Sequence, residues 1–370
     1  MESRNVQEPK ALIWDSIGLQ SLHSGVGHHA YSLNEALGRR GIVPQVLPSH
    51  PCIDSVWRTQ LASSVPSVQQ KWQRLKPYAL WTAGRQLRSW LSSRSGGRAC
   101  VVHGLSNYNI PRYYRSDGIR TVLTVHDLIP LLEPRAVSSY LAAFLRWQMP
   151  RALERADAII TVSAWTRSTL EELFPQARGK IVTIPNGCQR SFPPVLANPL
   201  PQRLLTIARG EAYKQLELIP RILEQLPPQF HWDLVTDAHG IDRLHRSAGS
   251  LQHRLRILKG LSQIELDRVE EEAGIYVHPS RWEGYCLPAA SALARGRPVV
   301  YVKGSGIDEV VDSGGFGLER EAGPELWVRA IEELSAQYEL WSSRARAHAQ
   351  HFLSWEEVAN QTLAVYDILT

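Results

Sequence analysis

The sequence predicts an α/β protein made of two doubly wound domains, each built around a parallel sheet. Its 370 residues are too many for one ordinary core and suit two domains of average size. Short apolar runs alternate with helix-like segments along nearly the whole chain, which is typical of parallel strands covered on both faces. A proline-rich segment at 191–202 interrupts this alternation. We therefore expect domains at 1–190 and 191–350, followed by a C-terminal helix at 351–370.

The first domain is expected to begin with a strand at 11–14 and a glycine-containing turn at Ser24-Gly25-Val26-Gly27. A helix should follow this turn, because apolar residues then recur with helical spacing at Ala30, Leu33, Ala36 and Leu37. Further strands are expected at 100–102, 121–125, 158–162 and 181–184, with helices at 140–156 and 165–174. Pro185-Asn186-Gly187 should stop the last of these strands.

The second domain repeats the alternation. Strands are expected at 204–208, 232–235, 255–258, 275–277 and 298–302. Helices are expected from Lys214, near Leu244, from Ser262 and at 289–294. Ser262 and Glu265 have the spacing of a capping box, which marks a helix N-terminus. In the C-terminal helix, one stripe is formed by Trp355, Val358, Thr362, Tyr366 and Leu369.

The composition excludes several classes of protein. With 44% hydrophobic and 21% charged residues, the chain is neither disordered nor unusually charged. No stretch approaches the roughly 18 uninterrupted apolar residues that a membrane-spanning helix requires. The four cysteines are scattered and form no CxxC pair, which argues against a disulfide framework and against a structural zinc site. We therefore expect a cytoplasmic protein.

A basic, tryptophan-rich stretch runs from Trp57 to Arg98 without any acidic residue. Within it, apolar positions have helical spacing at Leu80, Ala83, Leu87 and Leu91. Two interpretations stay open for this stretch. It forms either an amphipathic surface that binds the inner face of an anionic membrane or a helical pair that packs its tryptophans inside the domain. Nucleic-acid binding is not expected, because no nucleic-acid motif accompanies the basic residues.

The segment with the clearest chemical meaning is 278–288, His-Pro-Ser-Arg-Trp-Glu-Gly-Tyr-Cys-Leu-Pro. It places Glu283 directly after a strand and before a helix that should begin near Pro288. Free backbone N–H groups at a helix start bind anions, and proline suits the first turn. We expect phosphate oxygens to bind at this start, along Gly284, Tyr285, Cys286 and Leu287. Glu283 would then accept hydrogen bonds from sugar hydroxyls.

This segment resembles the acidic motif of the family 4 glycosyltransferases (group 1), which is a glutamate, seven residues and a second glutamate. Other segments follow in the family's order, namely 24–27, 124–128, 156–163, 184–187, 207–209 with Lys214, and 306–311. The resemblance implies the GT-B fold, in which two Rossmann-like domains face a central cleft and a C-terminal helix crosses back to the first domain. It also implies a retaining, metal-independent enzyme with a nucleotide sugar as co-substrate and no other cofactor.

The resemblance also implies roles for individual residues. Arg209 and Lys214 match the family's diphosphate clamp, where fixed cations stabilise the leaving nucleoside diphosphate in the transition state. His126 resembles the histidine that contacts the transferred sugar. Gly25 and Gly27 match the glycine loop that approaches the donor phosphates and the acceptor, since glycine lets the backbone come close to a ligand.

One position departs from the family pattern. The second glutamate of the motif falls at Ser291, whose single hydroxyl cannot make a bidentate, charge-assisted contact with two ribose hydroxyls. The base is expected to contact the backbone near Leu258 to Leu261. We expect an active enzyme whose binding of the nucleotide differs from the family pattern.

Similarity around His126 suggests that the enzyme transfers a hexose, mannose from GDP-mannose, to a polysaccharide, an oligosaccharide or a lipid-linked glycan. Two alternatives stay open. One is a catalytically degenerate binding or scaffold protein, which Ser291 motivates. The other is a nucleotide-sugar epimerase, which shares the two-domain fold.

Overall fold

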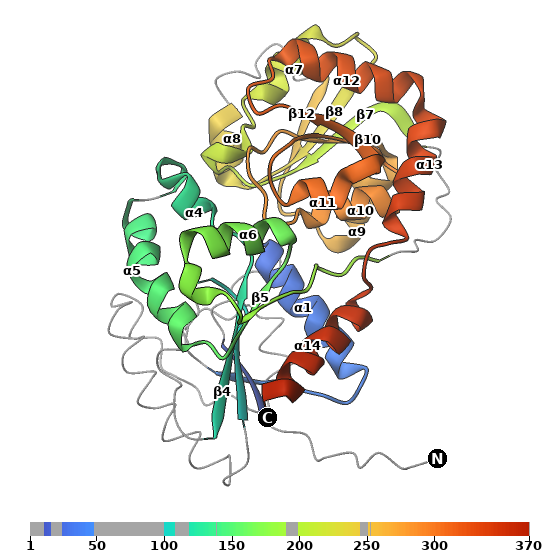
Figure 1. Ribbon diagram of the computed structural model, residues 1–370. Helices are drawn as coiled ribbons and strands as arrows, with labels where there is room; N and C mark the ends of the chain where they lie inside the picture. Colours follow the sequence, from blue (N-terminus) through green and yellow to red (C-terminus); the bar gives the residue numbers. More distant parts are fainter. Residues whose placement is uncertain are drawn as a thin grey trace. The chain divides into compact units, whose positions relative to one another are not determined.

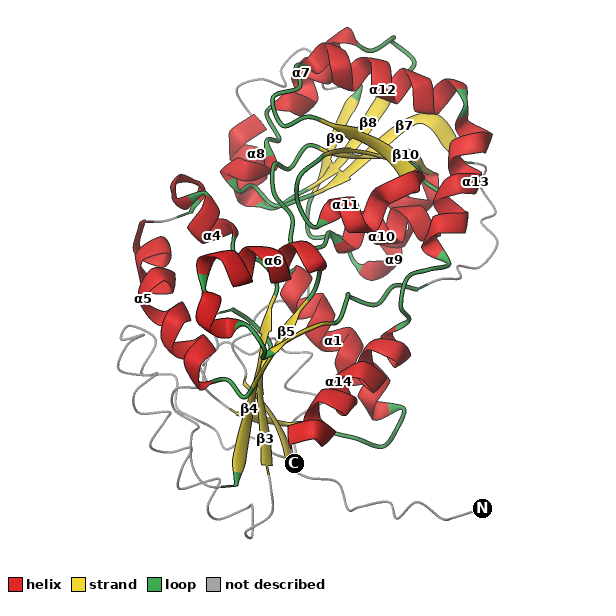
Figure 2. Cartoon of the chain, in the orientation of Figure 1, coloured by secondary structure: helices red, strands yellow, loops and turns green. Residues whose placement is uncertain are grey.

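Two parallel sheets organise the chain, each covered by helices (Figures 1 and 2). The structure is a computed structural model that describes residues 11–15, 24–47, 100–107, 118–137, 139–189, 199–244, 251 and 253–369. The chain divides into two units. Unit 1 comprises 1–128, 143–187 and 355–370, and unit 2 comprises 129–142 and 188–354. The expected division into domains at 1–190 and 191–350 stays a prediction.

Unit 1 contains, among its described residues, a six-stranded sheet in the order β2-β1-β3-β4-β5-β6. Every neighbouring pair in it is parallel. The strands are β1 (Ala11–Asp15), β2 (Gln45–Leu47), β3 (Cys100–Gly104), β4 (Ile119–Val125), β5 (Ala158–Thr161) and β6 (Ile181–Thr183). The five strands predicted in this part of the chain are confirmed. β3 and β5 are buried throughout, as expected of strands covered on both faces.

The helices of unit 1 include α1 (Gly25–Gly38), α6 (Ala164–Leu173) and α14 (Trp355–Leu369). Most of α5 (Ser139–Arg155) also belongs to unit 1, since the division between the units falls between residues 142 and 143. Ser24 caps α1 by accepting a hydrogen bond from the N–H of Gly27. The predicted apolar face of α1 is buried, and α14 packs beside α1. The expected return of the C-terminal helix to the first unit is therefore confirmed.

Unit 2 contains a second sheet, whose described strands are all parallel and follow the order β12-β11-β10-β7-β8-β9. The strands are β7 (Leu200–Ile207), β8 (His231–Val235), β9 (Leu255–Leu258), β10 (Ala273–His278), β11 (Val299–Val302) and β12 (Gly315–Leu318). The helices are α4 (Ile129–Leu132), α7 (Leu218–Gln225), α8 (Ala238–Leu244), α9 (Gln263–Glu272), α10 (Leu287–Ala294), α11 (Ile307–Val311), α12 (Pro324–Ala336) and α13 (Tyr338–Ala349). Trp232 and Trp327 lie fully buried in its core.

Two expectations about unit 2 are wrong in detail. The segment expected to be a linker, 191–202, ends earlier, because β7 already begins at Leu200. The helix expected from Lys214 begins at Leu218. Lys214 instead ends a 3₁₀ turn at Ala212–Lys214, and the next residue, Gln215, has a φ of 50°, which stops helical geometry. The capping box of Ser262 and Glu265 is confirmed.

The basic, tryptophan-rich stretch from Trp57 to Arg98 lies outside the described residues, so its two interpretations stay open. In the part of the chain that the structure describes, no helix is both long enough and apolar enough to cross a membrane.

Candidate functional site

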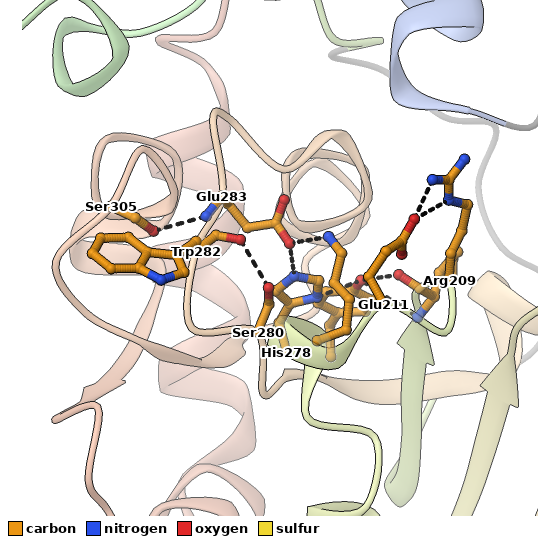
Figure 3. A network of polar contacts seen from close by, with 10 residues as sticks. Arg209, Glu211, His278, Ser280, Trp282, Glu283 and Ser305 are labelled. Atoms are coloured by element: carbon orange, nitrogen blue, oxygen red, sulfur yellow. Dashed lines mark hydrogen bonds and ion pairs between the residues drawn. The ribbon is translucent and has the colours of Figure 1, made fainter. Parts of the chain in front are cut away.

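The carboxyl ends of two neighbouring strands bring the predicted residues of unit 2 together. Arg209 and Lys214 follow β7, and Glu283 follows β10. These strands pair in parallel at the centre of the sheet, so the loops after them emerge at the same edge. A backbone hydrogen bond of 2.8 Å from Arg281 to Tyr213 joins the two loops. Figure 3 shows the resulting network of polar contacts.

At the centre of this site, Lys214 and Glu283 form a buried ion pair. The Lys214 Nζ lies 2.5 Å from Glu283 Oε1, and the side chains are 13% and 11% exposed. The same carboxylate oxygen lies 2.5 Å from His278 Nε2. Glu283 therefore holds one cation and one imidazole on a single oxygen.

The electrostatics of the pair favour the charged forms. Burial alone would raise the pKa of Glu283, but Lys214 and His278 together lower it to about 2. Burial would likewise lower the pKa of Lys214, but Glu283 outweighs it and raises that pKa. Burial lowers the pKa of His278, against the opposing effect of Glu283. Near neutral pH the site holds an ammonium, a carboxylate and a neutral imidazole.

The backbone of Glu283 is fixed by the loop that follows β11. Its N–H donates to Ser305 Oγ at 3.1 Å, and its carbonyl accepts from the N–H of Gly306 at 2.8 Å. A Cβ on Gly306 would lie 2.1 Å from the carbonyl oxygen of Gly284, so this close approach requires glycine. The segment 306–311, noted above only as a motif in the family's order, thus positions the acidic loop.

Arg209 lies at the same edge of the sheet but pairs with a different carboxylate. Its Nε donates to Glu211 Oε1 at 2.8 Å, and its Nη2 contacts the same oxygen. The Arg209 side chain is 59% exposed, so it is open to a ligand. Glu211 was not among the predicted site residues, although its position between two matched cations was a usable signal.

The segment 284–287 leads into the start of α10, and phosphate binding along it stays a prediction. Cys286 is the N-cap residue and has a φ of 81°, which is rare for a residue with a Cβ. Its side chain does not cap the helix. Tyr285 and Cys286 are buried, and burial raises the pKa of the Cys286 thiol. The helix begins at Leu287, one residue before the expected Pro288.

Ser291 lies on α10 and faces the neighbouring helix α9. Its Oγ donates to Glu270 Oε1 at 2.9 Å, and Arg295 lies 3.2 Å from the other oxygen of Glu270. Burial raises the pKa of this carboxyl. A buried carboxylate thus lies next to the position where the family motif has its second glutamate. At Leu258, the backbone carbonyl accepts a hydrogen bond from the N–H of Thr236 at 2.9 Å.

In unit 1, the end of β4 carries His126 in a buried polar cluster. The His126 Nε2 lies 2.9 Å from the Leu105 carbonyl, and its backbone N–H donates to Asn107 Oδ1 at 2.7 Å. The ring of His29 meets the ring of His126 edge-on at 5.0 Å. Burial lowers the pKa of His126 to about 4, so the ring is neutral at pH 7.

His29 in turn is held by Asn186, which lies in the segment 184–187 that follows the last strand of this unit. Its Nδ1 lies 2.7 Å from Asn186 Oδ1, and its ring packs edge-on against Trp355 of α14 at 5.6 Å. Gly25 and Gly27 lie in the first turn of α1. A Cβ added to Gly25 would meet nothing within 4 Å, so no neighbour in the chain requires glycine there.

One set of side chains among the described residues has the composition of a metal site. The ligand atoms of His278, Glu283 and Cys286 lie within 4.8 Å of one another. The Lys214 ammonium already bonds to the Glu283 oxygen of that set, and a cation there opposes a metal ion. Metal independence, expected from the sequence, stays a prediction.

Comparison with known proteins identifies both halves of the chain. Residues 23–192 match the family "Glycosyltransferase Family 4", and residues 190–350 match "Glycosyl transferases group 1". The chain therefore combines a glycosyltransferase family 4 domain with a glycosyl transferases group 1 domain. The fold is GT-B, as the sequence predicted.

Several known proteins are similar to this chain at low sequence identity. "O-antigen chain mannosyltransferase B" of Escherichia coli is 24% identical over 283 residues, which cover 71% of this chain and 74% of that protein. "Glycogen synthase" of Mycobacterium tuberculosis is 26% identical over 386 residues, covering 92% and 90%. The structure of Anabaena HepE in complex with UDP and glucose superposes with a TM-score of 0.72 at 17% identity, covering 97% and 100% of the two chains.

Proposed function

We propose that this glycosyltransferase moves a hexose from a nucleotide-diphosphate sugar to a glycan acceptor with retention of anomeric configuration. The observation that carries the proposal is the buried Lys214–Glu283 pair at the carboxyl ends of β7 and β10. A cation and a carboxylate side by side suit a ligand that joins a diphosphate to a polyhydroxyl ring. Ligands of doubly wound sheets bind at this edge.

In this mechanism, Lys214 and Arg209 bind the diphosphate, which gains negative charge as the glycosidic bond breaks. Fixed cations stabilise that charge more in the transition state than in the ground state. Glu283 accepts hydrogen bonds from hydroxyls of the hexose. The acceptor hydroxyl attacks the anomeric carbon from the side that the leaving group departs from, and a phosphate oxygen of the leaving group takes the acceptor's proton. No metal ion takes part.

The choice of hexose and acceptor rests on the relatives. The similarity to an O-antigen mannosyltransferase supports mannose from GDP-mannose and a lipid-linked or polysaccharide acceptor. The similarity to glycogen synthase and the likeness to HepE with UDP and glucose make glucose donors the second set to test. A cytoplasmic enzyme at the inner face of the membrane suits a lipid-linked acceptor.

Release of nucleoside diphosphate from a panel of nucleotide sugars tests this proposal, with and without glycan acceptors. We expect one donor to be turned over, and Lys214→Ala to lower turnover by on the order of 10²-fold, as when other electrostatic stabilisers are lost. Arg329→Ala, on the exposed face of α12, is the control for loss of a cation and should leave turnover unchanged.

The outcome of this panel also separates the alternatives. Isomerisation of the sugar without transfer would identify an epimerase. Absence of both turnover and donor binding would identify a scaffold protein. Turnover by Lys214→Ala equal to that of the wild type would remove Lys214 from the mechanism.

A further inference from the structure

Two buried aromatic side chains of β10 lie behind the Lys214–Glu283 pair. Tyr276 and His278 are two residues apart, so they point to the same face of the sheet. Their rings stack at 5.7 Å with an interplanar angle of 17°, and only 1% of Tyr276 and 2% of His278 is exposed. His278 also contacts Glu283, as Figure 3 shows. The proposed transfer reaction assigns no role to either side chain.

The hydrogen bonds define which nitrogen of His278 carries the proton. An ionised Glu283 can only accept, so His278 Nε2 must donate to it at 2.5 Å. Because burial keeps this imidazole neutral, its Nδ1 then carries a lone pair and needs a donor. The Tyr276 hydroxyl lies 3.2 Å from Nδ1. The same hydroxyl accepts a hydrogen bond from the backbone N–H of Ile207 at 3.4 Å and lies 3.2 Å from the Ile207 carbonyl oxygen, so its single proton is shared between that oxygen and Nδ1.

These contacts connect the backbone of β7 to the carboxylate. The order is Ile207 N–H, Tyr276 hydroxyl, His278 imidazole and Glu283 Oε1. Lys214 bonds to the same Glu283 oxygen from the other loop. Among the described residues, the Glu283 carboxylate thus has two side-chain partners, and it would share the Lys214 ammonium with a bound diphosphate.

We propose that His278, which stacks on Tyr276 and is held in its Nε2–H tautomer by the Glu283 carboxylate, is a positioning residue that keeps this carboxylate directed at the sugar while Lys214 binds the diphosphate. This inference rests on the proposed function. Without His278, a buried carboxylate would lose its remaining fixed donor when Lys214 turns to the ligand, and an unpaired buried charge reorients or takes up a proton. The histidine contributes by orientation and does not itself contact the reacting atoms.

A matched pair of substitutions tests this inference. Glutamine places its side-chain N–H₂ near the position of Nε2, whereas asparagine reaches only as far as Nδ1. We expect His278→Gln to keep kcat within about threefold of the wild type. We expect His278→Asn to lower kcat by about 10-fold or more, the loss typical of a hydrogen bond to a charged group, with little change in donor KM.

Binding of nucleoside diphosphate, measured by calorimetry, should be the same in both variants, because Lys214 and Arg209 are intact. Equal kcat in the two variants would overturn the inference, whether both are active or both are impaired. Loss of diphosphate binding in His278→Asn would also overturn it, since it would mean general disruption of the site.

A second readout does not depend on turnover. The ¹⁵N chemical shifts of the His278 ring, assigned by comparison with His278→Asn, should show a neutral Nε2–H tautomer in the wild type. Tyr276→Phe keeps the stacked ring and should leave this tautomer in place, because the Glu283 carboxylate still accepts from Nε2–H. A wild-type ring protonated on Nδ1 would contradict the inference even if the transferase is active. If no nucleotide sugar is turned over but the tautomer is as expected, the proposed function fails and the arrangement of the ring stands.

Discussion

At the scale of single residues, the buried Lys214–Glu283 pair dominates the energetics of the site. Removing one partner of such a pair leaves an uncompensated charge and typically costs about 3–5 kcal/mol. We expect Glu283→Gln to lower the free energy of unfolding of unit 2 by about that amount near pH 7, as measured by denaturant unfolding. A double variant, Glu283→Gln with Lys214→Met, should recover part of the loss, because it also removes the orphaned cation.

The Lys214–Glu283 pair also makes the stability difference between the wild type and Glu283→Gln depend on pH. The pKa of Glu283 is about 2 in the folded chain, against an ordinary value of 4.5. Its contribution is therefore fully present above pH 4.5 and is lost as the pH falls towards 2. The difference in unfolding free energy between wild type and Glu283→Gln should be constant from pH 5 to 7 and shrink below 4.5. A difference that grows on acidification would contradict this assignment.

The sequence could predict only some of the site residues, and their position along the chain decided which. Glu283 was predicted from its place between a strand and a helix start, whereas Arg209 and Lys214 were matched through the family resemblance. All three follow strands of one parallel sheet, whose carboxyl ends meet at the same edge. Glu270 and Ser305 were not predicted as site residues, because their roles arise from packing between elements far apart in sequence. No local pattern distinguishes such a glutamate or serine from a surface residue.

At the scale of elements, the start of α11 supports the acidic loop through close backbone contact. Gly306→Ala would bring a Cβ to 2.1 Å from the Gly284 carbonyl oxygen, so the two loops must separate. We expect this variant to lower turnover and the thermal stability of unit 2 together. Gly38→Ala is the matched control, because a Cβ there meets nothing within 4 Å. Equal effects of the two substitutions on turnover would show that the loop contact is not needed.

Strands were easier to predict than helices in this chain, for a physical reason. Buried parallel strands are continuous apolar runs, and β3, β5, β10 and β11 have that pattern. β12 was missed, because its sequence, Gly-Phe-Gly-Leu, resembles a turn. The start of α7 was misplaced, because the left-handed Gln215 carries no local signal of its conformation.

At the scale of whole units, buried neutral histidines should make unit 1 sensitive to acid. Burial lowers the pKa of His103 to about 3 and that of His126 to about 4, and it lowers that of His29 well below 6.5. Below pH 6.5 the unfolded chain binds protons that the folded unit excludes, so stability falls as the pH falls from 6.5 towards 4.

Hydrogen exchange at the amides of β3 and β4 can measure this loss of stability. Each such histidine contributes a slope of about 1.4 kcal/mol per pH unit within this window. We expect His103→Gln to remove one such contribution from the slope between pH 4.5 and 6. An unchanged slope would show that His103 binds its proton equally well in the folded and unfolded chain.

The proposed function depends on binding of the diphosphate of a nucleotide sugar to unit 2 through Lys214. Calorimetric titration of the wild type and of Lys214→Ala with UDP, GDP and ADP measures this interaction. We predict that the wild type binds at least one of these nucleotides, and that Lys214→Ala binds it about 10-fold or more weakly, since a charge-assisted hydrogen bond contributes about 1.5–3 kcal/mol. Equal affinity in the two proteins, or no binding of any nucleoside diphosphate to the wild type, would contradict the claim.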